Sequence, residues 1–309
     1  MPTAIPKILI IGGRGMLAER LRQRLTHVGA VIHAPGKEQL DITDDAAVAR
    51  ALADMRPDLV INAAAFLNTE RCEADPASSY AVNSKAAGVL ARLVGLLPDT
   101  RLVQFSTDFV FDGIKGGYAE TDVVRPLSYY GLHKALADEA IQRLPGQNYI
   151  LRIASVIGAP LGKRDFIRAL TDRIAKGVTH LDVNDEFEIS LSTTGLVCDA
   201  VAEIAAGRIR PGLYHCAARG RTTWHQVATR ALQRLGHTLP INPVPASAYP
   251  LPTPRPPKSW MLVDKLAAQW PALPDWQTAL DRQIDVLRQE TSVDLSDVDF
   301  SRPLAGDPR

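Results

Sequence analysis

The chain has 309 residues, of which 46% are hydrophobic, so it is long enough for one large domain or two ordinary ones with a buried core. Lys and Arg total 35 against 34 Asp and Glu, and a net charge of +1 supplies no field to gather nucleic acid or a membrane surface. The apolar runs are strand-length, well short of the roughly 20 residues of a membrane-spanning helix. We therefore expect a soluble protein with neither a nucleic-acid nor a membrane partner.

A strand pattern begins at Lys7, which leaves no room for a signal peptide, so we expect a cytoplasmic protein. Cys72, Cys198 and Cys216 are odd in number and far apart, with no CxxC or Cys/His spacing. The sequence therefore predicts neither a disulfide framework nor a metal site.

In the first half, short runs of β-branched residues alternate with longer helical patterns, which is typical of βαβ units. The expected strands are 7–11, 30–33, 59–61, 102–105 and 149–153, and the expected helices are 15–27, 44–55, 77–97 and 128–144. This pattern predicts an α/β fold with a doubly wound Rossmann-type parallel sheet. We assign residues 1–155 to an NAD(P)-binding domain, with later segments near 178–207 added to it.

The second half predicts a smaller C-terminal substrate-binding α/β domain over residues 156–309. Its expected helices are 165–176, 196–206 and one from about 223, with strands near 181 and at 212–216. Eight prolines between Pro240 and Pro257 predict an extended loop. The polar residues from about 292 predict a loose tail.

The first chemical signal is the segment from Gly12 to Ala18, which has the spacing GxxGxxA between a predicted strand and a predicted helix. Glycine lets the backbone approach a pyrophosphate, and the helix N-terminus offers free N–H groups to the phosphates. Any tight turn also favours glycine, but the βαβ context favours a dinucleotide. We predict that Gly12, Gly15, Met16 and Leu17 bind the cofactor.

The second predicted strand is followed by Lys37, where an NAD-specific unit carries an acidic residue. This lysine could pair with the 2′-phosphate of NADPH or be an ordinary surface lysine, so NADPH is expected and NADH is possible. The carboxylate of Asp41 could accept from the adenine amino group, and small residues after the third strand leave room for a ligand or for close packing. The predicted cofactor contacts are Lys37, Asp41, Ile42, Ala63, Ala64 and Ala65.

The third signal is Tyr130 and Lys134, which start a predicted helix downstream of a Ser-Thr-Asp triplet at a strand end. At this spacing both side chains share one helix face, so the ammonium can lower the pKa of the phenol and the phenol can act as acid or base. A surface pair would have the same spacing, but the Rossmann-like context favours catalysis. We predict that Thr107, Tyr130 and Lys134 are catalytic, with the Thr107 hydroxyl bound to the substrate carbonyl.

Together with further blocks in the same order, these motifs resemble the dTDP-4-dehydrorhamnose reductase family of the extended short-chain dehydrogenase/reductases. The resemblance covers roughly residues 7–289. The matching blocks are 40–44, 56–58, 62–65, 73–76, 82–83, 105–113, 120–122, 126–127, 212–215, 222–224, 247–250 and 255–257.

The resemblance implies reduction of the C4 ketone of a nucleotide-linked 4-keto-6-deoxyhexose, the last step in making dTDP-L-rhamnose. Tyr130 would donate the proton, Lys134 would hold the nicotinamide ribose, and Thr107 would polarise the carbonyl. Arg255 would contact the diphosphate or only anchor its loop. The expected substrate contacts are Ser106, Thr107, Asp108, Phe109, Tyr130 and Arg255.

Two departures from the family pattern lie on the substrate side. The segment after Arg152 lacks the usual tryptophan, and residues 185–193 lack the Gly and Pro of a family block. A reductase or epimerase acting on a different nucleotide sugar therefore stays open. So do an NADPH-sensing binding protein and a non-catalytic partner similar to the regulatory β subunit of methionine adenosyltransferase.

Some family members are linked to Mg²⁺, but the sequence contains no ligand cluster that we would assign to a metal. The expected assembly is a monomer or a homodimer.

Overall fold

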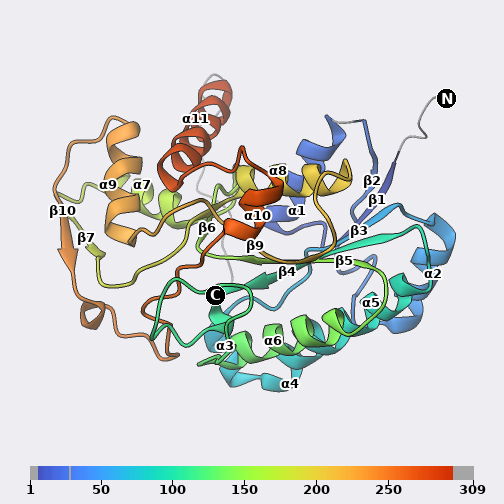
Figure 1. The fold of residues 1–309 in the computed structure, drawn as a ribbon. Helices are drawn as coiled ribbons and strands as arrows, with labels where there is room; N and C mark the ends of the chain where they lie inside the picture. Colours follow the sequence, from blue (N-terminus) through green and yellow to red (C-terminus); the bar gives the residue numbers. More distant parts are fainter. Residues whose placement is uncertain (1–5, 28, 295–309) are drawn as a thin grey trace.

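The computed structural model describes residues 6–27 and 29–294 (Figure 1). Its central sheet has six strands in the order β2-β1-β3-β4-β5-β9, and every pairing in it is parallel. The chain builds outward from β1 to one edge and then to the other, so the predicted doubly wound α/β fold is confirmed. The strands are β1 (Lys7–Ile11), β2 (Val31–His33), β3 (Leu59–Asn62), β4 (Arg101–Thr107), β5 (Gln147–Ile153) and β9 (Gly212–His215).

Helices cover both faces of this sheet, which is why the inner strands are continuously apolar rather than alternating. One face packs against α1 (Met16–Thr26) and α8 (Thr194–Ala205), and the other against α2 (Asp45–Met55), α5 (Ala87–Gly95) and α6 (Tyr129–Gln142). Each fully buried Leu or Ile side chain of these two cores contributes about 1.5–3 kcal/mol.

The segment between β3 and β4 is more broken than the predicted single helix 77–97. It contains α3 (Thr69–Ala74), which the sequence analysis missed, then α4 (Pro76–Tyr80), a π-helical stretch (Ala81–Ala86) and α5. The side chain of Asn83 accepts from the backbone N–H of Phe66 at 2.9 Å and donates to its carbonyl at 2.9 Å. The π-helical stretch, a feature frequent at functional sites, therefore holds the loop that leaves β3.

Part of the C-terminal half packs around a separate hydrophobic core, at the left of Figure 1. Its core joins Ile157, Leu191, Val227, Leu280 and Ile284. Its elements are β6 (Val156–Ile157), α7 (Phe166–Ala175), β7 (Leu181–Asn184), β8 (Ser192–Thr193), α9 (Trp224–Arg234), β10 (Ile241–Val244) and α11 (Trp276–Asp294). The helix α10 (Asp264–Gln269) instead packs on β9 of the large sheet.

Two predictions for this half are wrong in part. The Pro-rich stretch is not all loop, because β10 pairs with β7 and places Pro243 opposite Val183. A two-stranded sheet consists only of edges, where the missing N–H of proline is tolerated. The predicted loose tail from 292 overlaps α11, which ends at Asp294, and residues 295–309 lie outside the described residues.

The segment near 178–207, which we assigned to the NAD(P)-binding domain, contributes to both the large sheet and the small one. Its helix α8 packs against α1 on the large sheet, whereas β7 belongs to the small sheet with β10. The two-domain division itself stays a prediction. None of the described helices is long and apolar enough to span a membrane.

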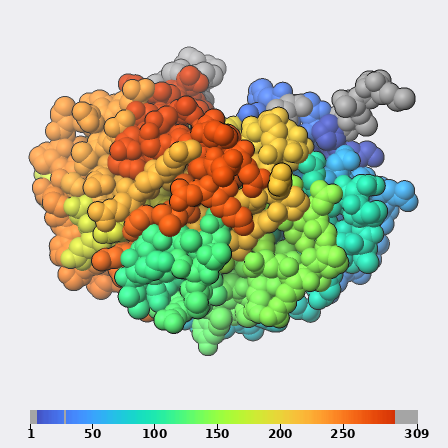
Figure 2. Space-filling model, in the orientation of Figure 1, coloured from blue at the N-terminus to red at the C-terminus, as the bar shows by residue number. Residues whose placement is uncertain are grey.

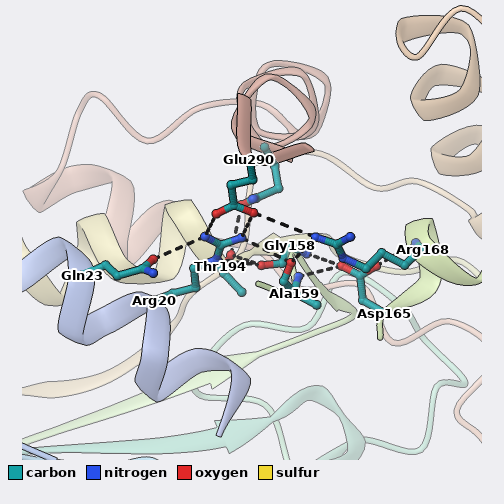
Figure 3. A network of polar contacts seen from close by, with 9 residues as sticks. Arg20, Gln23, Gly158, Ala159, Asp165, Arg168, Thr194 and Glu290 are labelled. Atoms are coloured by element: carbon teal, nitrogen blue, oxygen red, sulfur yellow. Dashed lines mark hydrogen bonds and ion pairs between the residues drawn. The ribbon is translucent and has the colours of Figure 1, made fainter. Parts of the chain in front are cut away.

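A polar network joins the two halves at α1 (Figure 3). Arg20 is only 8% exposed and donates to the carbonyls of Gly158 and Ala159, each at 3.2 Å, and to the carboxylate of Glu290. Asp165 accepts from the backbone N–H groups of the same two residues, at 2.6 and 2.8 Å. One guanidinium therefore holds the segment after β6 and the helix α11 against α1.

We expect Arg20→Ala to lower the free energy of unfolding by about 3 kcal/mol, because Glu290 loses its bidentate partner and two buried carbonyls each lose one of their hydrogen bonds. Urea unfolding measures this change. The matched control is Arg22→Ala, an exposed position on the same helix that should change stability by less than about 0.5 kcal/mol. Equal effects of the two substitutions would contradict a joining role for Arg20.

Candidate active site

A cavity of about 300 Å³ lies where β1, β3, β4 and β5 end. Parallel strands bring their carboxyl ends to one edge, which is where ligands of such sheets bind. A larger cavity of about 420 Å³ between α1, α8 and α11 contains none of the predicted site residues. The predicted residues that line the smaller cavity are Gly15, Met16, Leu17, Ala63, Ala64, Ala65, Ser106, Thr107, Asp108, Phe109, Tyr130, Lys134 and Arg255.

The turn after β1 accepts only glycine at two positions. A Cβ on Gly12, whose φ is +83°, would lie 2.7 Å from the backbone nitrogen of Ala64, and one on Gly13 would lie 2.0 Å from the carbonyl oxygen of Ala34. Gly15 precedes α1 and supplies no side-chain cap, so the first N–H groups of this helix point to the cavity edge without a capping side chain. Gly12 therefore shapes the turn without lining the cavity, and the helix start suits a diphosphate.

The three alanines after β3 follow a buried asparagine that bends the chain. Asn62 accepts from the N–H of Ala64 at 3.1 Å and donates to the Gln104 side chain at 2.7 Å. Ala63 continues the sheet by donating to Ile11 at 3.0 Å. Small side chains at this point keep the floor of the cavity open.

Lys37, Asp41 and Ile42 lie outside the cavity, beyond β2. Lys37 is 79% exposed and its ammonium lies 3.6 Å from the Asp41 carboxylate. That carboxylate accepts from the backbone N–H and the hydroxyl of Thr43, and these hydrogen bonds hold the pKa of Asp41 below its usual value. Ile42 is buried in the core beside α2, so the adenine-side roles of these three residues stay predictions.

Tyr130 sits in the first turn of α6 because Ser128 caps that helix by accepting from Gly131. Its ring is half-buried and packs edge-to-face on Phe109 at 6.0 Å between ring centres, and its hydroxyl is hydrogen-bonded with Thr107. Burial raises the pKa of Tyr130 against this hydrogen bond, so the phenol is protonated at neutral pH. The expectation of a lowered phenol pKa is therefore not met.

Lys134 lies one helical turn further on and is 3% exposed. Its ammonium donates to the carbonyl of Phe105, while burial lowers the pKa of Lys134 to about 8 and the charge of Asp138 opposes this shift. The cavity thus combines a protonated phenol with an ammonium that is still mostly charged at pH 7.

A buried charge network that the sequence analysis missed lies beneath this pair. Asp138, the residue four positions after Lys134, accepts from the Ser106 hydroxyl at 2.9 Å and from Arg152 at 3.0 Å. Ser106 lines the cavity, but the structure directs its hydroxyl to Asp138. The spacing of Asp138 on α6 was the available signal, because i and i+4 share a helix face.

Asp108 is 3% exposed, next to Thr107. Burial raises the pKa of Asp108 to about 6, opposed by hydrogen bonds from Ser259 and Thr107. Ser259 follows the Pro-rich stretch, so the C-terminal half reaches the centre of the site here. Figure 2 shows the orange and red segments packed directly on the green segment that follows β4.

Arg255 closes the far end of the cavity. Its guanidinium lies 5.5 Å from the centre of the Phe109 ring and pairs with Glu70 of α3 at 2.7 Å. The sequence analysis proposed Arg255 but not its partner, since α3 itself was not predicted.

Several lining residues had no individual prediction. Those at strand ends were detectable in principle from the rule that ligands bind there, whereas the residues entering α3 carried no motif. They are Asn62, Leu67, Thr69, Phe105, Ile153, Ser155 and Val156. No group of three His, Cys, Asp or Glu side chains able to hold a metal occurs among residues 6–27 and 29–294.

Residues 6–289 match the family model described as RmlD substrate binding domain. The chain belongs to this family. A dTDP-4-dehydrorhamnose reductase of Burkholderia thailandensis is 34% identical over 89% of this chain and 96% of its own length. The family resemblance inferred from the sequence motifs is thereby confirmed.

Two further similarities extend this family assignment. A probable dTDP-4,6-dihydroxy-2-methyloxan-3-one 4-ketoreductase of Streptomyces antibioticus is 33% identical over 91% of this chain and 96% of its own. The crystal structure of a dTDP-4-dehydrorhamnose reductase from Clostridium acetobutylicum superposes with a TM-score of 0.84 at 26% identity, covering 91% of this chain and 99% of that one. The similarity to family members therefore includes both halves of the molecule.

We expect the buried Asp108 carboxyl to make stability fall with rising pH. Its pKa rises from 3.8 to about 6 on folding, so its contribution is complete below about pH 4 and is lost as pH rises through 6, up to about 3 kcal/mol. Asp108→Asn should remove this contribution. Urea unfolding at pH 4 and 7 should therefore show the variant gaining stability relative to the native protein at the higher pH.

The exposed Asp99 supplies the control variant Asp99→Asn, which removes a carboxylate elsewhere. An Asp108→Asn difference that is the same at both pH values would mean that this carboxyl titrates alike in the folded and unfolded chains.

Proposed function

We propose that the protein reduces the C4 ketone of a nucleotide-linked 4-keto-6-deoxyhexose with NADPH, converting dTDP-4-dehydro-L-rhamnose to dTDP-L-rhamnose. The observation that carries this proposal is the meeting of Thr107, Tyr130 and Lys134 in one cavity that begins at the glycine turn of α1. The names of the relatives supply the substrate class. Both the cofactor and the sugar nucleotide are cytoplasmic metabolites, so we place the reaction in the cytoplasm.

The residues present fit a dinucleotide. Side chains at Gly12 and Gly13 would fill the space where the backbone bends, and the N–H groups at the start of α1 can bind the diphosphate. The alanines at 63–65 leave space beside it, and the ammonium of Lys134 can bind ribose hydroxyls. NADPH, when bound, supplies the hydride that the ketone carbon receives.

The side chains at the cavity centre can supply the proton and stabilise the charge. The Thr107 hydroxyl donates to Asp108 in this structure, and by rotating about its C–O bond it can donate instead to the ketone oxygen and polarise it. The protonated Tyr130 phenol can then give its proton to that oxygen, because an alkoxide is a stronger base than a phenolate. The Lys134 ammonium, one helical turn further on and lining the same cavity, can stabilise the phenolate left behind.

We expect Tyr130→Phe to lower kcat by about 10²–10⁴-fold, the usual contribution of a general acid. NADPH binding, measured by fluorescence titration, should stay within a few-fold, because the ring and its contact with Phe109 are kept. The control is Tyr129→Phe, at the exposed neighbouring position, which should retain activity. Loss of NADPH binding in Tyr130→Phe would indicate a structural tyrosine instead.

A second candidate is reduction of a different dTDP-linked keto sugar, which the Streptomyces antibioticus relative favours at nearly the same identity. Val156 lines the cavity in the segment where the family tryptophan is missing, so the sugar pocket departs from the family pattern. NADPH oxidation followed at 340 nm with each sugar nucleotide distinguishes the two. Binding of NADPH without turnover of either would favour a sensing or partner role.

We expect Lys37→Ala to raise the KM for NADPH by about fivefold, corresponding to about 1 kcal/mol for an exposed ion pair with the 2′-phosphate. The KM for NADH should not change, because NADH lacks that phosphate. Steady-state kinetics with both cofactors gives the comparison. Equal changes for both would remove the 2′-phosphate role of Lys37.

A further inference from the structure

Arg255 reaches the active-site cavity from a backbone that is itself held in place. Gly113 has a φ of +73°, and a Cβ there would lie 2.6 Å from the nitrogen of Pro257. Two backbone hydrogen bonds flank this close approach. The N–H of Lys258 donates to the carbonyl of Gly113 at 3.1 Å, and the N–H of Glu188 donates to the carbonyl of Pro257 at 2.9 Å. The backbone next to Arg255 therefore has little freedom, and the orientation of the guanidinium depends on its side-chain contacts.

Two contacts set that orientation. The Nη2 group of Arg255 donates to Glu70 Oε1 at 2.7 Å, and the guanidinium carbon lies over the Phe109 ring. The other oxygen of Glu70 accepts from the hydroxyl of Thr69 at 3.0 Å. Glu70 therefore holds Arg255 through Nη2, and Thr69 in turn holds the Glu70 carboxylate.

Glu70 uses only one of the three guanidinium nitrogens of Arg255. Arg255 Nε is buried and has no hydrogen-bond partner among the described residues, although Arg255 lines the same cavity as Tyr130 and Thr107. Arg255 therefore brings to the wall of this cavity donor groups that the described residues do not use. A guanidinium edge matches two oxygens of a phosphate group.

Glu70 remains ionised while it anchors Arg255. Burial acts to raise the pKa of this carboxyl, but hydrogen bonds from its own backbone N–H and from Thr69, together with the charge of Arg255, lower it overall. The anchor is therefore present across the whole neutral pH range.

We propose that Glu70 is a positioning residue that holds the guanidinium of Arg255 at the cavity, where its remaining N–H groups contact the diphosphate of the nucleotide sugar. This inference rests on the proposed function, since it takes the substrate to be a nucleoside diphosphate sugar. It assigns to α3 a part in substrate affinity that acts only through Arg255. Direct repulsion between the Glu70 carboxylate and the diphosphate would change the affinity in the opposite direction, so the sign of the effect separates the two.

The test measures binding of dTDP and of thymidine to the NADP⁺-loaded protein by calorimetry, which needs no turnover. Glu70→Ala should raise the Kd of dTDP roughly fivefold to tenfold. Glu70→Gln should stay within about threefold of native, because its amide oxygen can still accept from Nη2. Thymidine, which has no phosphate, should bind all three proteins alike.

A double-mutant cycle decides whether Glu70 acts through Arg255. Arg255→Ala should weaken the binding of dTDP, and adding Glu70→Ala to that variant should cause no further loss of affinity. Glu139→Ala, which removes an exposed carboxylate from a surface pair on α6, is the matched control and should bind dTDP as the native protein does. Thermal unfolding of each variant separates lost affinity from lost folding.

Tighter dTDP binding by both Glu70 variants would overturn the proposal in favour of simple repulsion. A further loss in the double variant would overturn it too, because Glu70 would then act independently of Arg255. If the native protein binds dTDP but reduces no keto sugar, the proposed reaction fails while the positioning role is still tested. If the native protein does not bind dTDP, the nucleotide class itself is wrong.

Discussion

The parallel pairing of β1, β3, β4 and β5 is the constraint on which the site depends. It brings the glycine turn, the three alanines, the Ser106–Asp108 triplet and the end of β5 to one edge, although they are far apart in sequence. Because both faces of the sheet are covered by helices, that edge is where the sheet is open to a ligand. The helix α6 places Tyr130 and Lys134 in the lining of the same cavity.

Burial of charge is the recurring cost of this arrangement. Lys134 and Asp108 are nearly inaccessible, and their pKa values move toward neutrality to about 8 and about 6. Arg152 and Asp138, with side chains 4% and 2% exposed, keep a buried ion pair beneath them. Such pairs rarely add net stability, so their presence below the cavity is better explained by the order they impose on Ser106 and the helix carrying Lys134.

The C-terminal half completes the cavity rather than forming it. Its two approaches, Ser259 to Asp108 and Arg255 to Glu70, both come from the C-terminal end of the Pro-rich segment, where Pro256 and Pro257 pack against Gly113. Arg20 on α1 holds the other junction between the halves. The large sheet and α6 thus bring Thr107, Tyr130 and Lys134 to the cavity, and the second half adds the contacts of Ser259 and Arg255 around them.

Local pattern by itself determined five strands of the parallel sheet, most helices, the glycine turn and the pairing of Tyr130 with Lys134, because strand and helix periods, steric limits on glycine and i, i+4 spacing are readable over a few residues. It also found the strand at 212–216 but assigned it to the C-terminal half, whereas β9 is the sixth strand of the large sheet. It could not place α3, the π-helical stretch or β10, where tertiary contacts of Asn83 and Val183 override propensity. Nor could it show that Ser106 turns to Asp138, that burial raises the phenol pKa, or that Glu70 meets Arg255 across 185 residues. Those features depend on desolvation and on contacts between distant segments, which only the folded chain brings together.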